Sequence, residues 1–447
     1  MADNGDFFRI ISQSDMYYLQ SNKDDGFLGY FHKNYGIYEY NNENPKMIVS
    51  TQLILTKAAV FIDKLVTKDY VFDVRFLAFI YIIIYAFSAY LIVKVLTEDI
   101  ESNKYKLLIT VLFLFIFCDT GYVAYFNSFF GEAVSLNFFL LSLGILLYMY
   151  KFKRYSILNL FMFFLSSLIF FGSKQQLAPV GVLVAFVLIR LFMTSRQRKF
   201  RYTSLGLALI ILISSAYFYK SISGDFDYIN RYHAMTRGVL LYEWNPDEIL
   251  KDFNINAQYS MLQESIYFNK LPVINPNDDK LKKEFYSKYS FFSILGFYFK
   301  NPRIFGKMIN FAVVNGYSIR PKVIGNYEKR EGKAFGQQSY FFPLWSSIKE
   351  RWVPHNLFLT VLAFGIYFAF SFKRYLAARR KKNLEAQLFE EAFLFVFLVG
   401  VSQIFISIIG AGDADLGKHV FMFNVSFDII FLHSISLGIK SLYRNRA

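Results

Sequence analysis

Long apolar runs constrain this chain more than any other feature. Each is close to the roughly 20 residues that a helix needs to cross a bilayer, and short polar connections separate most of them. Hydrophobic residues make up 55% of the 447 residues and charged residues 19%, which is too apolar for an ordinary soluble protein. We predict nine membrane helices, at residues 74–96, 105–122, 132–150, 156–173, 177–194, 203–219, 355–372, 392–410 and 418–438.

The net charge of +15 follows the expected membrane topology rather than a nucleic-acid surface. A nucleic-acid interface would place the basic residues on one face, with aromatic platforms between them. Here they lie in alternate connections between apolar runs, which marks those connections as cytoplasmic. The single cysteine, Cys118, lies in an apolar run and supports neither a disulfide framework nor a zinc site. The basic connections contain Lys104, Lys106, Lys151, Lys153, Arg154, Arg196, Arg198, Lys199, Arg201, Lys373, Arg374, Arg379, Arg380, Lys381 and Lys382.

We therefore predict an all-α polytopic membrane protein in four parts. Residues 1–73 form a first extracytoplasmic loop with interfacial helices, and 74–219 hold membrane helices one to six. Residues 220–354 form an extracytoplasmic domain or lid, because they are far too long for a simple connection. Residues 355–447 hold the last three helices.

The first loop carries two expectations of its own. Its segment 51–66 has a broad apolar face and should lie flat on the membrane. The loop also lies outside with no preceding span to carry it across, so we expect an upstream helix to be missing from the chain as given.

Polar residues gather at the predicted outer ends of the helices, where charges at membrane depth tend to mark function. A transferase that takes a sugar from a polyprenyl phosphate needs a carboxylate to accept a proton and cations to hold the leaving phosphate. This face offers both, whereas the sequence contains no convincing Walker, Rossmann or metal-binding motif. Four clusters fall there: Asp3 to Asp6, Asp119 to Glu132, Lys174, and Asp413 to His419.

Most of these residues also have an ordinary structural explanation. Asp6 could be a solvated loop acid, and Asp119 a polar anchor at a helix end. Asn127 and Glu132 could cap the third span, and Lys174 could extend to the membrane interface.

Two observations are harder to dismiss. Lys418 and His419 are cations at a helix amino end, where they oppose the helix dipole unless an anion binds. Asp428 lies near mid-membrane and should pair with Arg190 or another polar neighbour, or line a proton or substrate path.

The order of several short strings resembles a known family, the bacterial GT-C membrane glycosyltransferases, specifically the hexose transferases of S-layer and cell-wall glycan biosynthesis. The resemblance covers nearly the whole chain. The strings are NGDFFRI, DVRFLAFIY, YFNSFFGEA, SKQQ, NPDEIL, GNYEKREGK, LWSS and GDADLGKHVFMFNVSFD. Such enzymes usually have a helix before the first external loop, so this chain departs from the pattern at its start.

The resemblance implies a polyprenyl-phosphate sugar donor, an inverting transfer to a cell-envelope glycan acceptor, and a site on the outer side of a bacterial plasma membrane. It implies Asp6 as the general base, with Asp119 as the second candidate. Lys174, Lys418 and His419 would hold the donor phosphate. Substrate binding is assigned to Asn127, Glu132, Tyr327 and Gln338.

No cofactor is predicted, and a divalent metal stays open, with Asp413 and Asp415 as plausible oxygen ligands. Aromatic residues of the long external segment, including Tyr327, Tyr340 and Trp345, could stack on sugar rings or anchor at the interface. Membrane lipid is the other expected partner, and nucleic acid is not.

Two other functional classes remain open. A lipid-linked polysaccharide polymerase or ligase would work through Arg and His in the large loop, which contains Arg231, His233 and Arg237. A transporter or flippase would show charged or broken helices at mid-membrane, and Asp428 is the clear instance. The acidic first loop favours the transferase.

Overall fold

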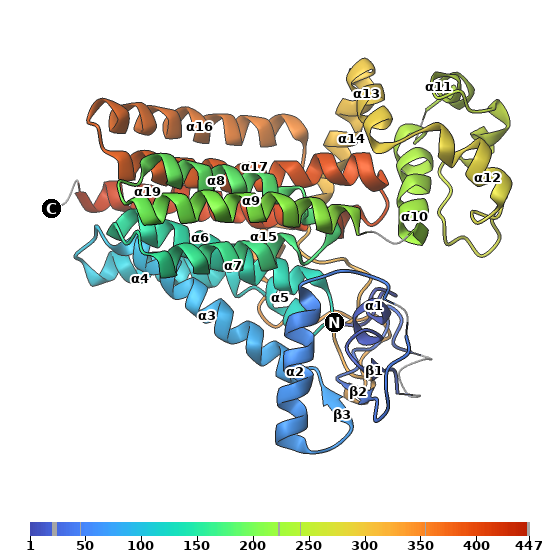
Figure 1. Ribbon diagram of the computed structural model, residues 1–447, viewed down its shortest axis with the longest axis horizontal. Helices are drawn as coiled ribbons and strands as arrows, with labels where there is room; N and C mark the ends of the chain where they lie inside the picture. The colour runs from blue at the N-terminus through green and yellow to red at the C-terminus, as the bar shows by residue number, and fades with distance from the viewer. Residues whose placement is uncertain (20–24, 45, 222–223, 242, 354, 445–447) are drawn as a thin grey trace.

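The computed structural model describes residues 1–19, 25–44, 46–221, 224–241, 243–353 and 355–444. Its main body is a bundle of helices that run roughly along one direction (Figure 1). They are α3 (Arg75–Thr97), α4 (Asn103–Phe117), α6 (Gly131–Phe152), α7 (Ile157–Phe171), α8 (Val180–Thr194), α9 (Arg198–Lys220), α16 (Leu357–Arg380), α17 (Leu384–Ala411) and α19 (Phe421–Arg444).

Every predicted span falls on one of these helices, but not all of them are long enough to cross a bilayer alone. Six pass by length and composition: α3, α6, α9, α16, α17 and α19. Helix α4 continues through a 51° bend into Thr120–Asn127, which gives a seventh span if the pair is counted as one. Helices α7 and α8 have 15 residues each, about 22 Å of helix against a hydrocarbon core of about 30 Å. The polytopic helical bundle is confirmed, while the count of nine stays a prediction.

Small residues bring the central helices close together. Gly400 of α17 faces Ser426 of α19, where an added Cβ would lie 2.6 Å from the serine Cβ. Gly144 of α6 faces Leu91 of α3, at 3.1 Å by the same measure. Such contacts let helix backbones approach, as is common within membranes. Helix α6 is the most enclosed of the six long helices, with 89% of its apolar window buried.

Residues 1–73 form a compact N-terminal module at one end of the bundle. Three short antiparallel strands, β1 (Met16–Tyr17), β2 (Asn34–Ile37) and β3 (Val71–Asp73), pair in that order. The module also contains α1 (Phe8–Ile11) and α2 (Gln52–Thr67). The small sheet is a departure from the predicted all-α fold, because strands of two to four residues are too short to show an alternating pattern.

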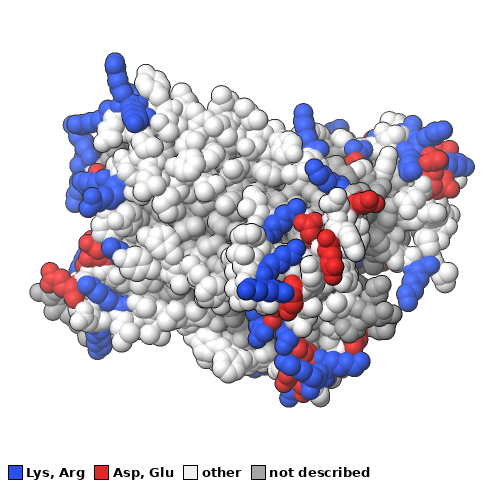
Figure 2. Space-filling view, turned by 60° about the horizontal axis from the view of Figure 1, so that its bottom comes forward, with Lys and Arg blue, Asp and Glu red and all other residues white. Residues whose placement is uncertain are grey.

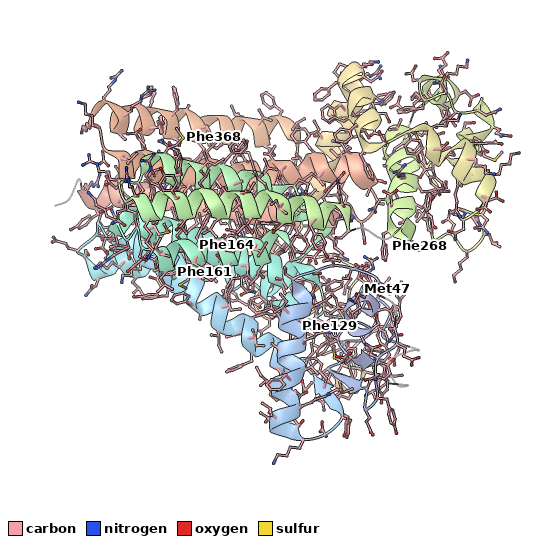
Figure 3. The ribbon with its side chains drawn as sticks, viewed as in Figure 1. Met47, Phe129, Phe161, Phe164, Phe268 and Phe368 are labelled. Carbon is pink, nitrogen blue, oxygen red and sulfur yellow. The ribbon has the colours of Figure 1, made fainter. Side chains whose placement is uncertain are left out.

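Phe129 joins the N-terminal module to the bundle (Figure 3). Its ring contacts Phe7 at 5.4 Å and Tyr35 at 5.0 Å between centroids, and Phe72 of β3 lies 6.2 Å away. These edge-on and tilted contacts fix the sheet against the segment that precedes α6.

Helix α2 lies across the direction of the bundle helices rather than along it (Figure 1). Its apolar side chains Ile54, Phe61 and Leu65 are 61–63% exposed, whereas Thr56 and Asp63 are buried against the module. An apolar face turned outward on a helix that crosses the bundle axis fits the predicted position flat on the membrane.

The long segment after α9 first forms a group of external helices and then packs on the N-terminal module. Its first part contains α10 (Gly224–Ala234), η4 (Met235–Val239), α11 (Pro246–Asp252), η5 (Ala257–Leu262), α12 (Asp279–Glu284), η6 (Tyr286–Lys288), α13 (Phe291–Lys300) and α14 (Pro302–Asn315). The chain then returns to the N-terminal module, where the backbone N–H of Phe31 donates to the carbonyl of Tyr327 at 2.9 Å. It continues through η7 (Lys329–Glu331) and α15 (Leu344–Trp352).

Charge divides the molecule along its long axis. Figure 2 shows many Lys and Arg side chains with a few acidic ones at one end, a broad band of this face without charged side chains, and a larger share of acidic side chains at the other end. We call the end with many Lys and Arg side chains the basic end. The opposite end, which carries the N-terminal module and α10–α14, is called the domain end. This separation is the one expected of a membrane bundle.

Candidate functional site

Residues from all four predicted clusters lie at the domain end, and each cluster contributes at least one side chain to a common centre there. They are carried by the loop before α1, the first turn of α6, the turn at 172–177, and α18 (Leu416–His419) between α17 and α19. The predicted residues that come together are Asp6, Glu132, Lys174, Lys418 and His419.

Asp6 and Lys418 form the central ion pair. The Lys418 side chain is 7% exposed and that of Asp6 is 32% exposed. Arg9, one turn further along, holds the other carboxylate oxygen of Asp6 at 3.0 Å. Burial alone would raise the pKa of Asp6, but Lys418 and Arg9 outweigh it and hold that pKa well below its usual range. The carboxylate is therefore ionised and engaged by two cations.

The Lys418 ammonium has further neighbours of its own. It lies 4.7 Å from the centre of the Phe130 ring and 4.0 Å from a carboxylate oxygen of Asp415. Burial lowers the pKa of Lys418, but Asp6, Glu132 and Asp415 together raise it above its ordinary value. The lysine is thus charged at neutral pH.

Lys174 pairs with Glu132 beside this centre. Its Nζ donates to a Glu132 carboxylate oxygen at 2.7 Å, and Glu132 is 1% exposed while Lys174 is 24% exposed. Gly131 makes room for the lysine, since an added Cβ would lie 2.7 Å from the Lys174 Cγ. The Lys174 ammonium also acts electrostatically on Asp6 and on His419.

His419 is held by Gln176 of the same turn as Lys174. Its Nδ1 lies 2.8 Å from the Gln176 amide oxygen, while the Gln176 amide nitrogen donates to Ser407 and to the His419 carbonyl. Burial, and then Lys174, lower the pKa of His419 to about 4. A neutral imidazole that donates from Nδ1 keeps Nε2 as an acceptor at neutral pH.

The external helices η4 and α10 also contact residues of this centre. Arg237 of η4 binds both oxygens of Asp413 at 2.6 Å, just after α17 ends. Gly412, at φ +60°, allows this close approach, because an added Cβ would collide with the Arg237 carbonyl. The guanidinium of Arg9 lies 4.1 Å from the centre of the Phe226 ring on α10.

The charges of the site are matched in pairs. Four cations, Arg9, Lys174, Arg237 and Lys418, face four acids, Asp6, Glu132, Asp413 and Asp415. An entering anion would have to open one of these pairs. The Arg9–Asp6 pair, with side chains 35% and 32% exposed, is the least costly to open, because solvent can compensate the freed groups.

Asp119 and Asp428 lie in a separate, deeper cluster. One oxygen of Asp119 accepts from the backbone of Gly121 at 2.7 Å, where it caps α5 (Thr120–Val123), and the other accepts from the Ser346 backbone at 2.9 Å. Asp428 binds Lys349 at 2.7 Å, and both side chains are fully buried. Of the two expected partners of Asp428, the polar neighbour is the one found, and it is Lys349; Arg190 binds Glu391 instead.

The other predicted substrate-binding residues lie outside the central cluster. The Asn127 carbonyl accepts from the Met1 amino group at 2.9 Å. Gln338 is buried and donates to the carbonyls of Pro321 and Ile324, so it braces its own loop. The Tyr327 ring lies 5.8 Å from the Lys333 ammonium. Trp345 cannot stack on a sugar as the sequence suggested, because it is 4% exposed and donates to Asp428.

Sequence reasoning missed three contributors to this site. Arg9 had a signal, since it lies three residues after Asp6 and within a short helix. Gln176 lies in the string SKQQ but carried no assigned role. Ser407, inside α17, contacts Gln176 across 231 residues of sequence and had no signal at all.

Metal ligation finds little support around the two acids suggested for it. Within the described ranges, no group of three or more His, Cys, Asp or Glu side chains is placed to hold a metal ion. Asp413 is moreover engaged on both oxygens by Arg237.

A family model described as the YfdI N-terminal transmembrane domain matches residues 1–447. The chain belongs to this family. A YfdI relative from Escherichia coli (strain K12), which carries the name "Uncharacterized protein YfdI", is 24% identical over 382 residues, covering 84% of this chain and 78% of the relative. No solved structure matches the chain. Membership of the YfdI family, together with the apolar helices, identifies a multi-pass membrane protein.

Proposed function

We propose that the chain is a membrane glycosyltransferase of the GT-C type. It would move a hexose from a polyprenyl-phosphate donor to a cell-envelope glycan, with inversion, on the extracytoplasmic side of a bacterial plasma membrane. The observation that carries this proposal is the Asp6–Lys418 pair, a part-exposed carboxylate beside a buried cation at the end of apolar helices. The basic connections at the opposite end support an extracytoplasmic position.

The residues of the site suit a single displacement. The acceptor oxygen forms a bond to the sugar C1, the bond from C1 to the phosphate oxygen breaks, and the acceptor proton passes to Asp6. Lys418 and Lys174, which lie beside Asp6 and Glu132, would balance the negative charge that develops on the leaving phosphate. The lipid chain of the donor would remain among the apolar helices.

The low pKa of Asp6 also links donor binding to base strength. While Lys418 and Arg9 hold the carboxylate, it is a weak base. A phosphate that draws Lys418 away would raise the pKa of Asp6 and make it a better proton acceptor. The acceptor hydroxyl would then be activated mainly when a donor is bound.

Sugar transfer in membranes tests this proposal. Vesicles containing the parent chain, or its Asp6→Asn variant, receive radiolabelled polyprenyl-phosphate glucose and galactose with crude cell-envelope glycan. We expect the variant to lose about 100-fold or more in rate, the usual contribution of a general base. Glu331→Gln, which changes an exposed acid at the same end, is the matched control and should transfer normally.

Two results would count against the proposal. Transfer by Asp6→Asn at the parent rate would remove Asp6 as the base. Absence of transfer by the parent with every donor would favour the transporter alternative.

The polymerase or ligase alternative gains no specific support. Arg231 pairs with Asp227 at 2.7 Å, and the His233 Nε2 accepts from the Tyr267 backbone at 3.0 Å. Arg237 is bound to Asp413. All three residues are thus engaged, Arg231 and His233 within the external segment and Arg237 with the turn after α17.

A further inference from the structure

A hollow lies next to the proposed site, in the N-terminal module. A cleft of about 670 Å³ opens between α1, the sheet and the chain that follows β2. Its volume is within the usual range for small-molecule sites. None of the residues assigned above to base, phosphate or substrate lines it, so it has no role in the site already described.

Aromatic rings form much of the cleft wall. The rings of Tyr17 and Tyr38 lie 5.1 Å apart with a tilt of 43°, and Tyr40 and Phe8 also line the cleft. Tyr17 is 40% exposed and Tyr40 is 86% exposed. Flat, part-exposed rings of this kind can cover the C–H face of a sugar ring while the hydroxyl at the ring edge stays hydrated.

A glycine in the neighbouring strand makes room for the Tyr17 ring. Gly36 is the residue opposite Tyr17 in the antiparallel pairing of β1 and β2. An added Cβ at Gly36 would collide with the ring of Tyr17. The glycine therefore lets the ring lie against the neighbouring strand, which fixes its orientation.

The polar part of the cleft points to an uncharged, hydroxyl-rich ligand. Among the described residues that line it there is one carboxylate, Glu39, and no lysine or arginine. A phosphate would meet no cation there and would be repelled by Glu39. A lipid chain would leave the polar groups of Ser12, Glu39 and Asn44 facing hydrocarbon, which is costly.

The cleft is close to Asp6 and is held in place by local hydrogen bonds. Phe8 lies two residues after Asp6, so their Cα atoms are at most about 7 Å apart. Asn42 donates to the Ser12 carbonyl at 2.5 Å and to the Asp15 carboxylate at 3.1 Å, which ties the loop after β2 to the end of α1. A ligand in the cleft would therefore be positioned relative to the carboxylate.

We propose that this cleft binds the acceptor as a neutral saccharide, with sugar rings packed on Tyr17 and Tyr40 and one hydroxyl directed toward Asp6. Transfer to that hydroxyl rests on the proposed function. Binding of the saccharide in the cleft does not depend on the proposed function. The binding proposal and the transfer proposal can therefore fail separately.

Saturation-transfer difference NMR on the full chain in lipid nanodiscs tests the binding. The probes are neutral tetrasaccharides built from glucose, galactose, rhamnose or N-acetylglucosamine. We expect saturation of sugar-ring protons from at least one probe and a loss of affinity of about tenfold in Tyr17→Ala and in Tyr40→Ala. Tyr40→Phe, which keeps the ring, should bind nearly as the parent does.

A matched control separates the cleft from general exposure of tyrosine. Tyr202 of α9 is 64% exposed, does not line the cleft, and should be replaceable by alanine without effect on binding. Because Tyr40 is 86% exposed, its replacement should leave the fold intact, which thermal unfolding checks. Absence of saturation with every probe, or equal saturation of Tyr17→Ala, Tyr40→Ala and the parent, would overturn the proposal.

A transfer assay then distinguishes the two statements. Saccharide binding through the cleft by a chain that transfers no sugar would retain the cleft and reject the transferase. Transfer with an unchanged acceptor KM in Tyr40→Ala would retain the transferase and reject the cleft.

Discussion

Among the lysine–aspartate pairs toward the domain end, Lys349–Asp428 and Lys418–Asp6 differ in what surrounds them. In the deep pair, Asp428 receives Lys349 on one oxygen and both Tyr122 and Trp345 on the other, at 2.6 to 2.8 Å. Both charged side chains are fully buried. In the Asp6–Lys418 pair the lysine is nearly buried but the carboxylate is 32% exposed.

The difference separates a structural pair from one that can serve a ligand. Asp428 has no unengaged oxygen, and any movement of Lys349 would leave an uncompensated charge inside the protein. Asp6 can exchange one cation for another or for solvent, and its neighbours Arg9 and Lys174 offer alternatives. Proximity of opposite charges is common to both pairs, so access and exchangeable partners decide between the two roles.

The largest expected effect comes from breaking the deep pair. Lys349→Met should destabilise the protein by about 3–5 kcal/mol, because it strands the buried carboxylate of Asp428. Thermal unfolding in detergent measures the change. The double variant Lys349→Met with Asp428→Leu should recover most of the loss, since it removes both charges. A single variant as stable as the parent would show that the pair is not structural.

The next effect concerns the exchangeable pair. Lys418→Met should slow sugar transfer by about 10- to 100-fold, because the leaving phosphate loses a cation. The same change should raise the pKa of Asp6 and move the acid limb of the rate profile to higher pH, since Lys418 is the strongest of the charges that lower that pKa. Rate measurements from pH 4 to 8 show both effects. Lys418→Arg, which keeps the charge, should leave the limb near its original position.

A smaller effect is expected at Gly131, beneath Lys174. Gly131→Ala places a Cβ where the Lys174 side chain lies, at 2.7 Å from its Cγ. The lysine can move, so transfer should fall only about two- to tenfold. Stability should stay equal or rise slightly, because alanine is favoured over glycine in a helix. A drop in the unfolding temperature, without loss of transfer, would contradict the placement of Lys174 in the site.

The smallest expected effect is on the pH dependence of stability. The pKa of His419 is lowered to about 4 in the folded protein, against an unperturbed value of about 6.5. The folded state therefore binds fewer protons between these values, and its stability falls as the pH drops below about 6.5. Between pH 7 and pH 5, the free energy of unfolding of His419→Gln should fall by about 1–2 kcal/mol less than that of the parent. Thermal unfolding at the two pH values compares them, and identical losses would contradict burial of a neutral His419.

Much of this architecture could be predicted from sequence because the bilayer imposes a simple rule. Apolar run length places the helices, and the alternation of basic connections places the four polar clusters at one end. Lys174 and Lys418 come from turns far apart in the sequence, yet they share an end for that reason alone.

The rest depended on packing that no local pattern records. The sequence offered Arg190 as a partner for Asp428, and the structure pairs Arg190 with Glu391 instead. The partner of Asp428, Lys349, comes from α15 of the external segment, which hydropathy assigned to a separate part. The strands β2 and β3 pack on Phe129, and β1 pairs with β2, which a short sequence window cannot show.

One crossed measurement tests the contrast between the two pairs most directly. Asp6→Asn and Asp428→Asn are each scored for sugar transfer and for unfolding temperature in the same membranes. The account predicts that Asp6→Asn loses transfer while it keeps the parent unfolding temperature, and that Asp428→Asn unfolds at a lower temperature. An Asp6→Asn protein that unfolds early, beside an Asp428→Asn protein that stays folded but cannot transfer, would contradict the account.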